Sequence, residues 1–302
     1  MQLSQADWPY TIAGYATRLA TAAFVEDIMS LQQIAKETCI IRNTAGRKGR
    51  TISVAPGKTA MRHLHYGRTI LDAGDAPVAI DTGELETGLV CLKGSAKVTA
   101  DGQPFTLGRF DSLYVPRDAS IEITPGPGGC DVAEIAAPVG RAYPVQFVPF
   151  SRVQQDAGLH LNVGGAPNQR EVNILIGKNV EAGRILAGVT FSAPGNWTSW
   201  PPHEHAAILE EAYLYIDMPA PAFGLQLVYT NGTEEPELAT VVREGDVVLM
   251  PQGYHPNVAA PGGSINFLWM MAANREQEDR KYGVVNVQPE FAAIPSPLDR
   301  GR

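Results

Sequence analysis

Side chains that could bind a metal ion are concentrated in the second half of the chain. Of the six histidines, His203 and His205 stand one residue apart in the run PPHEHAAILEEAYLY, and His255 follows in the run MPQGYHPNV. On a strand, residues i and i+2 point to the same face, so His203 and His205 can direct two imidazoles at one point. A carboxylate from the next strand and His255 from a third strand would complete four ligands. Three imidazoles and one carboxylate suit Zn, Mn, Fe, Co or Ni, so this order of residues predicts a metal site.

Two adjacent glutamates compete for the carboxylate position. Only one of Glu210 and Glu211 can face the inside of a barrel, because successive side chains of a strand point to opposite faces. Glu211, Tyr213 and Tyr215 alternate with apolar residues. We therefore expect Glu211 to point inward as the ligand, and Glu210 is the alternative. The predicted metal ligands are His203, His205, Glu211 and His255.

Short strands separated by turns must position these ligands. The chain has 302 residues, of which 44% are hydrophobic, and it contains 30 glycines and 23 prolines. From about residue 40 onward, short alternating or apolar runs are broken by Gly, Pro, Asn and Asp, which is typical of strands and turns. Before that point, apolar residues at helical spacing predict one amphipathic helix over 22–37, and a long helix is expected again only over 274–283.

One pattern of strands occurs twice along the chain. Each copy has a strand, a turn, a second strand, and then a run of Gly, Asp, three or four mostly apolar residues and Pro. A single shift along the chain places Asp111 on Asp246, Pro116 on Pro251 and Ser120 on His255. Two antiparallel jelly-roll barrels fit this length and punctuation. We predict an all-β fold of two jelly-roll barrels in tandem with a short N-terminal helical segment. The expected units are an N-terminal extension (1–40), a first barrel (41–150) and a second barrel (151–302).

The first copy lacks the complete set of ligands. It contains a carboxylate, Glu86, but no His-x-His pair stands a few residues before it, and Ser120 replaces the third histidine. His63 and His65 form a separate His-x-His pair far from Glu86, and we assign this pair a structural role. The first barrel is therefore expected to be a scaffold without metal.

Charge and cysteine content limit the partners and the compartment. Asp and Glu outnumber Lys and Arg by 32 to 24, which gives a net charge of −8. Without a basic run, neither nucleic acid nor a membrane surface is expected as a partner. No apolar stretch reaches the roughly 18 residues of a membrane span, and the N-terminus lacks the pattern of a signal peptide. The three cysteines are widely spaced, so we expect no disulfide framework and a cytoplasmic protein.

The metal motif and the strands that follow it resemble the cupin superfamily. They resemble more closely the sugar-acid isomerases that include 5-deoxy-glucuronate isomerase and 5-keto-4-deoxyuronate isomerase. The runs PGNWTSWPPHEH and GDVVLMPQGYHPNVAAPGG are similar to the first enzyme, and EEAYLYIDMP is similar to the second. The resemblance is strong over about 165–275 and weaker over 45–140. It implies a bicupin fold and a homo-oligomer, and it favours Glu211 as the ligand.

The resemblance also implies an aldose–ketose isomerase that acts on a small-molecule sugar acid. The reaction would convert 5-deoxy-glucuronate to 2-deoxy-5-keto-gluconate in myo-inositol catabolism. One divalent metal per chain, with Zn preferred and Mn, Fe or Ni as alternatives, would act as a Lewis acid on the substrate oxygens. A side chain must carry a proton between C2 and C1. The candidates for this transfer are Tyr213, Tyr229, Tyr254 and Glu204.

The carboxylate of such a substrate calls for the planar fork of an arginine. Arg184, on a strand that precedes the metal motif, is the expected substrate-binding residue, with Arg170 and Arg275 as alternatives. Two other functions fit the same pattern. A cupin dioxygenase would contain iron or nickel and consume O₂, and a non-catalytic sugar-binding bicupin would tolerate the loss of a ligand.

Overall fold

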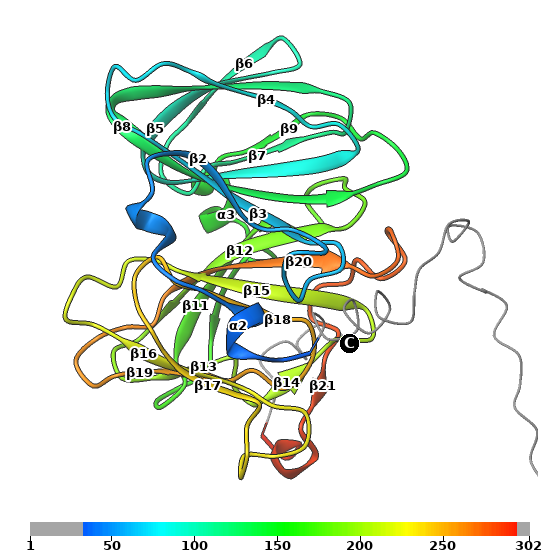
Figure 1. Ribbon diagram of the computed structural model, residues 1–302. Coiled ribbons are helices and arrows are strands. Elements are labelled where there is room, and N and C mark those ends of the chain that lie inside the picture. The colour runs from blue at the N-terminus through cyan, green and yellow to red at the C-terminus, as the bar shows by residue number, and fades with distance from the viewer. Residues whose placement is uncertain (1–32, 295–302) are drawn as a thin grey trace, which may run out of the picture.

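The protein consists of two antiparallel β units stacked on each other, the first above the second in Figure 1. The structure is a computed structural model that describes residues 33–294. Its antiparallel sheets and few short helices confirm the all-β fold expected from the alternating, turn-punctuated sequence. The helices are α2 (Lys36–Cys39) and α3 (Phe150–Gln155), and the 3-10 turns are η2 (Thr44–Gly46) and η3 (Pro289–Phe291).

The first unit is an eight-stranded sheet in which β2, β3, β8, β5, β7 and β9 are neighbours in that order, while β4 pairs with β8 and β6 with β5. Its strands are β2 (Gly49–Val54), β3 (His65–Leu71), β4 (Val78–Asp81), β5 (Leu85–Ala100), β6 (Gln103–Leu107), β7 (Ser112–Val115), β8 (Ser120–Pro138) and β9 (Gln146–Val148). The long pair β5 and β8 has two shifts of register. Such bulges bend a pair of strands and help a sheet curl into a barrel.

The second unit contains a seven-stranded sheet in the order β1-β18-β15-β20-β12-β11-β10, a four-stranded sheet in the order β13-β19-β16-β17, and the pair β14-β21. The strands of the large sheet are β1 (Ile40–Ile41), β10 (His160–Val163), β11 (Arg170–Ile176), β12 (Ile185–Ser192), β15 (Leu209–Tyr215), β18 (Val247–Met250) and β20 (Phe267–Ala273). The others are β13 (Trp197–Thr198), β14 (His203–Glu204), β16 (Gly224–Val228), β17 (Leu238–Val242), β19 (Asn257–Ala259) and β21 (Asn286–Val287).

The structure departs from both helical predictions. Most of the helix predicted over 22–37 lies outside the described residues, and over 33–35 it is wrong, because Ala35 is extended with φ −145°, whereas Lys36 and Glu37 belong to α2. The helix predicted over 274–283 is also wrong, because this segment forms turns. The backbone N–H of Gln277 donates to the carbonyl of Gly183, at 2.7 Å, and so ties the segment to the chain before β12.

A short strand flanks the sheet of each unit, and the one on the second unit comes from the chain before the first unit. β1 pairs with β18 of the second unit, and β9 pairs with β7 of the first. The aspartates of the sequence repeat hold these strands. Asp246 Oδ1 accepts a hydrogen bond from Asn43 N at 3.1 Å, and Asp111 Oδ1 accepts one from Phe150 N at 2.8 Å. The extents 41–150 and 151–302 stay our proposal for the two barrels.

Two hydrophobic clusters follow from the alternation of side chains along the strands. On β5, Leu89 and Cys91 belong to a cluster inside the first barrel, whereas Val90 and Leu92 belong to a larger cluster that extends into the second unit. One strand therefore contributes to both cores, because its successive residues point to opposite faces.

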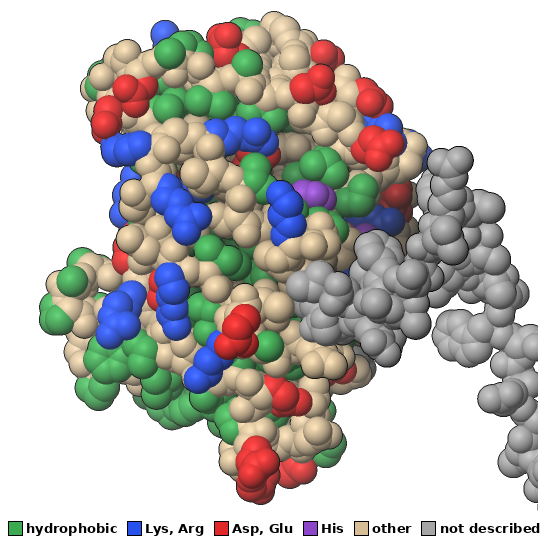
Figure 2. All heavy atoms as spheres, viewed as in Figure 1, with side chains coloured by type: hydrophobic (Ala, Val, Ile, Leu, Met, Phe, Trp, Pro, Cys, Tyr) green, Lys and Arg blue, Asp and Glu red, His purple; other side chains and the backbone are tan. Residues whose placement is uncertain are grey.

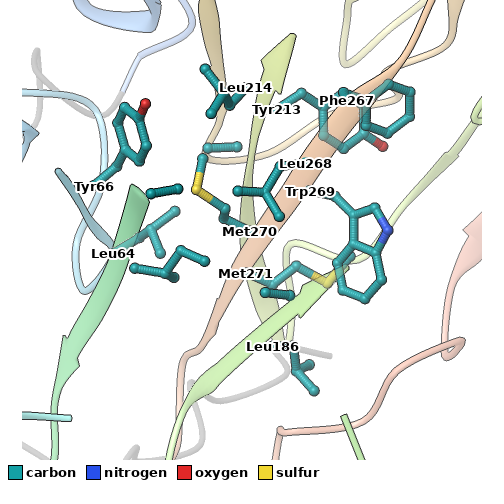
Figure 3. Close-up of a cluster of buried hydrophobic side chains, with 14 of the residues drawn as sticks. Leu64, Tyr66, Leu186, Tyr213, Leu214, Phe267, Leu268, Trp269, Met270 and Met271 are labelled. Carbon is teal, nitrogen blue, oxygen red and sulfur yellow. The ribbon is translucent and has the colours of Figure 1, made fainter. Parts of the chain in front are cut away.

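Strand β20 has the same double role in the second unit. Leu268 and Met270 belong to the cluster that includes Leu64 of the first unit, and Figure 3 shows them on the side of the strand that faces it. Trp269 and Met271 alternate with them and line a cavity inside the second barrel. Strand β20 therefore lines the cavity with one face and packs against the first unit with the other.

Among residues 33–294, no helix is long and apolar enough to cross a membrane. The face of the molecule in Figure 2 carries both basic and acidic side chains, interspersed with polar and apolar ones.

Candidate metal centre and its cavity

Three of the four predicted metal ligands meet inside the second barrel. His205, Glu211 and His255 are buried, and one ligand atom of each lies within 4.8 Å of the others. Glu211 Oε2 is 2.9 Å from His205 Nε2 and 3.1 Å from His255 Nε2. Glu211 is carried by β15, while His205 and His255 lie just beyond β14 and just before β19. Separations near 3 Å are those of neighbouring ligand atoms around an ion with bonds of about 2.1 Å.

His203, the fourth predicted ligand, faces the same cavity from β14. Its ring centroid lies 5.0 Å from that of His255 and 6.4 Å from that of His205. Strand β14 is held in place by pairing with β21, in which His203 is opposite Val287. The structure therefore brings all three imidazoles to one side of Glu211.

Backbone carbonyls orient each of these imidazoles. The Nδ1 atoms of His203, His205 and His255 lie 2.9, 3.1 and 2.8 Å from the carbonyl oxygens of Pro201, Leu209 and Gly253, respectively. A carbonyl can only accept a hydrogen bond, so each Nδ1 carries the hydrogen. In a neutral imidazole the lone pair is then on Nε2, which in His205 and His255 is the atom directed toward Glu211. Such outer hydrogen bonds are typical of metal-binding histidines.

The fit to a cation follows from the chemistry of these atoms. Three Nε2 lone pairs and a carboxylate are all acceptors, and buried acceptors need a donor or a positive ion between them. His255 Nε2 is buried without a hydrogen-bond partner among the described residues, although it lies 3.1 Å from Glu211. A divalent ion bound to the same atoms would satisfy it.

Burial and mutual contact shift the pKa values of these groups. Burial, followed by repulsion from the His255 imidazole, lowers the pKa of His203 to about 3, so His203 is neutral at pH 7. Burial opposes ionisation of Glu211, but the neighbouring imidazoles outweigh it and lower the pKa of Glu211 to about 2. Burial likewise opposes protonation of His205, yet its contact with Glu211 raises the pKa of His205 overall. The shifts of His203 and Glu211 favour a neutral imidazole and a carboxylate, the forms that bind metals, whereas a metal at His205 would have to displace the proton that its contact with Glu211 favours.

Glu210, the alternative ligand, points away from the cavity. Its Oε1 accepts hydrogen bonds from the backbone N–H groups of His63 and Leu64, at 2.7 and 2.6 Å. Its Oε2 accepts from Arg62 N at 2.8 Å. Glu210 thus binds the chain that enters β3 of the first unit.

The first unit makes the same clamp in return. Glu86 on β5 accepts hydrogen bonds from the backbone N–H groups of Gly183, Arg184 and Ile185, at 2.7, 2.6 and 2.8 Å. These residues lead into β12 of the second unit. Each barrel therefore holds the other through one buried carboxylate.

The register of the strands corrects the comparison of Glu86 with the metal-binding carboxylate. Thr87 pairs with Val115, and Glu211 pairs with Met250. Val115 and Met250 each stand just before the proline of the repeat. Thr87 therefore occupies the position of Glu211 in the first barrel, and Glu86 corresponds to Glu210.

The cavity beside the histidines has a volume of about 590 Å³, part of which is open to solvent. Apolar side chains form much of its wall. These are Val163, Val172, Leu209, Phe267, Trp269, Met271, Val284 and Val285. Its polar groups include Arg170, Thr190, Ser199, Tyr213 and Tyr282. A mostly apolar cavity with a few convergent polar groups is the usual form of a small-molecule site.

Of the three tyrosines predicted to be catalytic, Tyr213 lines the cavity. Its hydroxyl is 2.8 Å from Ser199 Oγ, and its ring stacks on Phe267 at 4.1 Å. Tyr229 and Tyr254 lie outside the cavity wall and pair with each other across a bridge. Tyr229 donates a hydrogen bond to Gln288 Oε1 at 2.6 Å.

The structure does not bring the expected substrate-binding arginine to the cavity. The Arg184 guanidinium donates to the carbonyl oxygens of Pro138, Ala273 and Asn274, at distances of 2.6 to 2.8 Å, at the junction of the two units. Glu204, another predicted proton carrier, accepts from Ala206 N instead.

Sequence reasoning missed the segment that closes the cavity after β20. Tyr282, Val284 and Val285 line it, and Tyr282 stacks on Trp269 with ring centroids 5.0 Å apart. No motif marks this stretch. Its only signal is one aromatic residue among valines beyond the last strong strand.

Comparison with known proteins agrees with the geometry of this site. The model of the KduI/IolB family matches residues 39–292. The chain belongs to the KduI/IolB family. The resemblance predicted from the metal motif is thus confirmed.

Individual relatives cover most of the chain. A protein named 5-deoxy-glucuronate isomerase from Geobacillus kaustophilus is 30% identical over 248 residues, which span 76% of this chain and 87% of the relative. One from Bacillus subtilis is 33% identical over 165 residues, spanning 52% and 58%.

Solved structures support the fold. An IolB-like protein from Salmonella typhimurium superposes with a TM-score of 0.75 at 25% identity, covering 85% of this chain and 99% of that one. Oxalate decarboxylase from Bacillus subtilis gives a TM-score of 0.57 at 14% identity, covering 83% and 78%. These likenesses confirm the predicted bicupin fold.

Proposed function

We propose that this member of the KduI/IolB family is a metal-dependent aldose–ketose isomerase. Its proposed substrate is the open-chain uronic acid 5-deoxy-glucuronate, and its product is 2-deoxy-5-keto-gluconate, an interconversion in myo-inositol catabolism. The observation that carries the proposal is the buried cluster of His205, Glu211 and His255, whose facing atoms are all acceptors. The names of the relatives supply the reaction and the substrate.

We assign one divalent metal per chain to His203, His205, Glu211 and His255, with Zn preferred over Mn, Fe or Ni. The bound ion would supply a Lewis acid that draws electron density from the substrate carbonyl and the neighbouring hydroxyl. The apolar wall and the segment around Tyr282 lower the polarity around the reacting atoms, which strengthens electrostatic interactions there.

Tyr213 is the proposed proton donor. Burial, together with the negative charge of Glu211, raises the pKa of Tyr213 well above its usual value, so the phenol keeps its proton at neutral pH. The hydrogen bond with Ser199 fixes the direction of its hydroxyl. Tyr213 would therefore act as an acid that donates its proton to the C1 oxygen, and the proton that leaves the C2 hydroxyl would restore the phenol, while the carbon-bound proton moves from C2 to C1.

Metal analysis and an isomerase assay test this function together. We expect about one Zn, Mn, Fe or Ni per purified chain, and conversion of 5-deoxy-glucuronate to the ketose followed by NMR. Tyr213→Phe should keep the metal and lower kcat about 100-fold, within the usual effect of losing an acid–base group. A metal-bearing protein that consumes O₂ and forms no ketose would overturn the proposal in favour of a dioxygenase.

We also propose that the enzyme works in the cytoplasm as a homo-oligomer. The described cysteines, Cys39, Cys91 and Cys130, are free and buried, as suits a reducing compartment. Phe223 and Leu225 are 38% and 44% exposed and provide apolar surface for a second copy. Light scattering should give a multiple of the 32.4 kDa chain mass, and a monomer would contradict this.

A further inference from the structure

Arg170 is a buried cation without a carboxylate partner. Its residue is only 7% exposed at the start of β11. Within residues 33–294, no Asp or Glu oxygen forms an ion pair with its guanidinium. Burial accordingly lowers the pKa of Arg170, as expected for a cation with no compensating charge. An unpaired buried charge is costly, so its presence calls for an anion from outside the chain.

The guanidinium is held rigidly but is not saturated. Its Nη1 and Nη2 donate to the carbonyl oxygens of Asn168 and Trp200, each at 2.9 Å. A guanidinium has five N–H donors, and these are the two hydrogen bonds it makes to the described residues. The side chain lines the same cavity as the histidines and Glu211. Donors therefore remain for a ligand inside that cavity.

One turn of the chain positions both Arg170 and a predicted metal ligand. The carbonyl of Trp200 holds Arg170, and the carbonyl of the next residue, Pro201, holds His203 Nδ1 at 2.9 Å. Trp200 and Pro201 are consecutive residues of the chain. The guanidinium and the imidazole are thus fixed to adjacent points of one wall.

We propose that Arg170 binds the carboxylate of the sugar-acid substrate and thereby directs its carbonyl end toward His203, His205, Glu211 and His255. This deepens the proposed function and rests on it. A planar guanidinium matches a carboxylate with paired hydrogen bonds, and the apolar wall around it strengthens the interaction. Arg170, and not Arg184, is then the residue that selects a uronic acid over a neutral aldose.

The test compares an acidic substrate with a neutral one of the same chain length. We would measure kcat/KM for 5-deoxy-glucuronate and for 5-deoxy-glucose, which has CH₂OH in place of the carboxylate. Arg170→Gln should lower the value for the acid about 100-fold and change the value for the neutral aldose less than about threefold. Arg170→Lys should recover part of the loss, because it restores the charge without the fork.

Arg184→Gln is the matched control, since Arg184 immediately precedes β12, the neighbour of β11, and its guanidinium donates to backbone carbonyls and pairs with Glu276. It should leave the acid-to-neutral ratio unchanged. Equal loss on both substrates in Arg170→Gln would make Arg170 a purely structural residue and overturn the proposal.

A binding measurement separates this proposal from the isomerase activity. Titration calorimetry would compare gluconate with glucitol, an anionic and a neutral open chain, on the metal-loaded protein. We expect gluconate to bind at least about tenfold more tightly to the wild type, and Arg170→Gln to abolish the difference. If that holds while no sugar is isomerised, the proposed function fails and the Arg170 site stands. If gluconate binds no more tightly than glucitol, the Arg170 site fails.

Discussion

Two adjacent carboxylates have opposite roles because they stand on opposite faces of β15. Glu211 faces three imidazoles inside the second barrel, and Glu210 binds the backbone of the first unit. Both are buried, so charge and burial alone do not distinguish them. Their partners distinguish them. Glu211 meets the lone pairs of imidazole nitrogens, whereas Glu210 meets backbone N–H donors.

Substituting each glutamate tests this division. Glu211→Gln should abolish most metal binding, because a ligand charge is lost. Glu210→Gln should keep the metal and lower the free energy of unfolding by about 2–4 kcal/mol, because its amide NH₂ faces backbone donors. Metal content by mass spectrometry and urea unfolding measure the two effects. The reverse outcome would contradict the assignment of the ligand.

The thiol of Cys91 carries a pH dependence of stability. Burial, followed by the charges of neighbouring Cys130 and Asp131, raises the pKa of Cys91 to about 12. An unfolded thiol ionises near pH 8.5, so the folded state holds this proton more tightly. The stabilisation is complete below about pH 8.5 and is lost as pH rises toward 12, by up to about 1.4 kcal/mol per pH unit.

Cys91→Ala should remove that part of the alkaline slope. Urea unfolding of wild type and variant at pH 8, 9 and 10 measures it. The variant loses a constant amount of stability through the missing sulfur, so the informative quantity is the difference in slope. Parallel curves would show that the folded protein holds this proton no more tightly than the unfolded chain, and would contradict the raised pKa of Cys91.

At the scale of elements, the cavity wall depends on how β12 and β20 approach each other. Gly188 on β12 lies opposite Trp269 on β20. A Cβ at position 188 would stand 2.2 Å from the Trp269 ring and 2.3 Å from the carbonyl oxygen of Asn173. The absence of a side chain thus lets the indole lie flat against the strand and stack on Tyr282.

Gly188→Ala should therefore push Trp269 toward the cavity. We expect a loss of about 1–3 kcal/mol in unfolding free energy, the usual cost of overpacking, together with weaker substrate binding and a shift in tryptophan fluorescence. Gly165→Ala is the control, because a Cβ there meets nothing within 4 Å. A Gly188→Ala protein with unchanged KM and fluorescence would contradict this view of the wall.

At the scale of the whole molecule, the two barrels depend on each other. Strand β1, which precedes the first unit, pairs with β18 of the second, and Glu86 and Glu210 clamp the two units in both directions. One hydrophobic cluster contains residues of both barrels, among them Leu64 of the first and Met270 of the second. Neither unit can lose its structure without exposing apolar surface of the other.

The chain should therefore unfold in a single cooperative transition. Differential scanning calorimetry of the metal-free protein should show one peak, and Leu64→Ala should move that whole peak to lower temperature, at a cost of about 2–5 kcal/mol. Two separate peaks, with only one moved by Leu64→Ala, would show that the barrels fold independently.

Much of the fold and part of the site were predictable from sequence because their signals are local. Alternation along a strand separates Glu210 from Glu211, the His-x-His spacing aims two imidazoles together, and glycines and prolines mark the turns. The repeated Asp111 and Asp246 indicated two similar units. The helix predicted over 274–283 does not form, because tertiary hydrogen bonds such as that from Gln277 to Gly183 outweigh weak helical periodicity, and the described part of 22–37 is helical only from Lys36.

Only the tertiary structure decided which residues share the cavity. Arg184 and Arg170 look alike in sequence, yet one is engaged by carbonyls between the barrels and the other faces the histidines. Tyr213 lines the cavity whereas Tyr229 and Tyr254 do not. Tyr282 also lines it, although it belongs to a segment without a sequence motif. The physical reason is that strand periodicity determines which face a side chain takes, whereas its partners come from strands distant along the chain. Those partners are set by how two curved sheets close and pack.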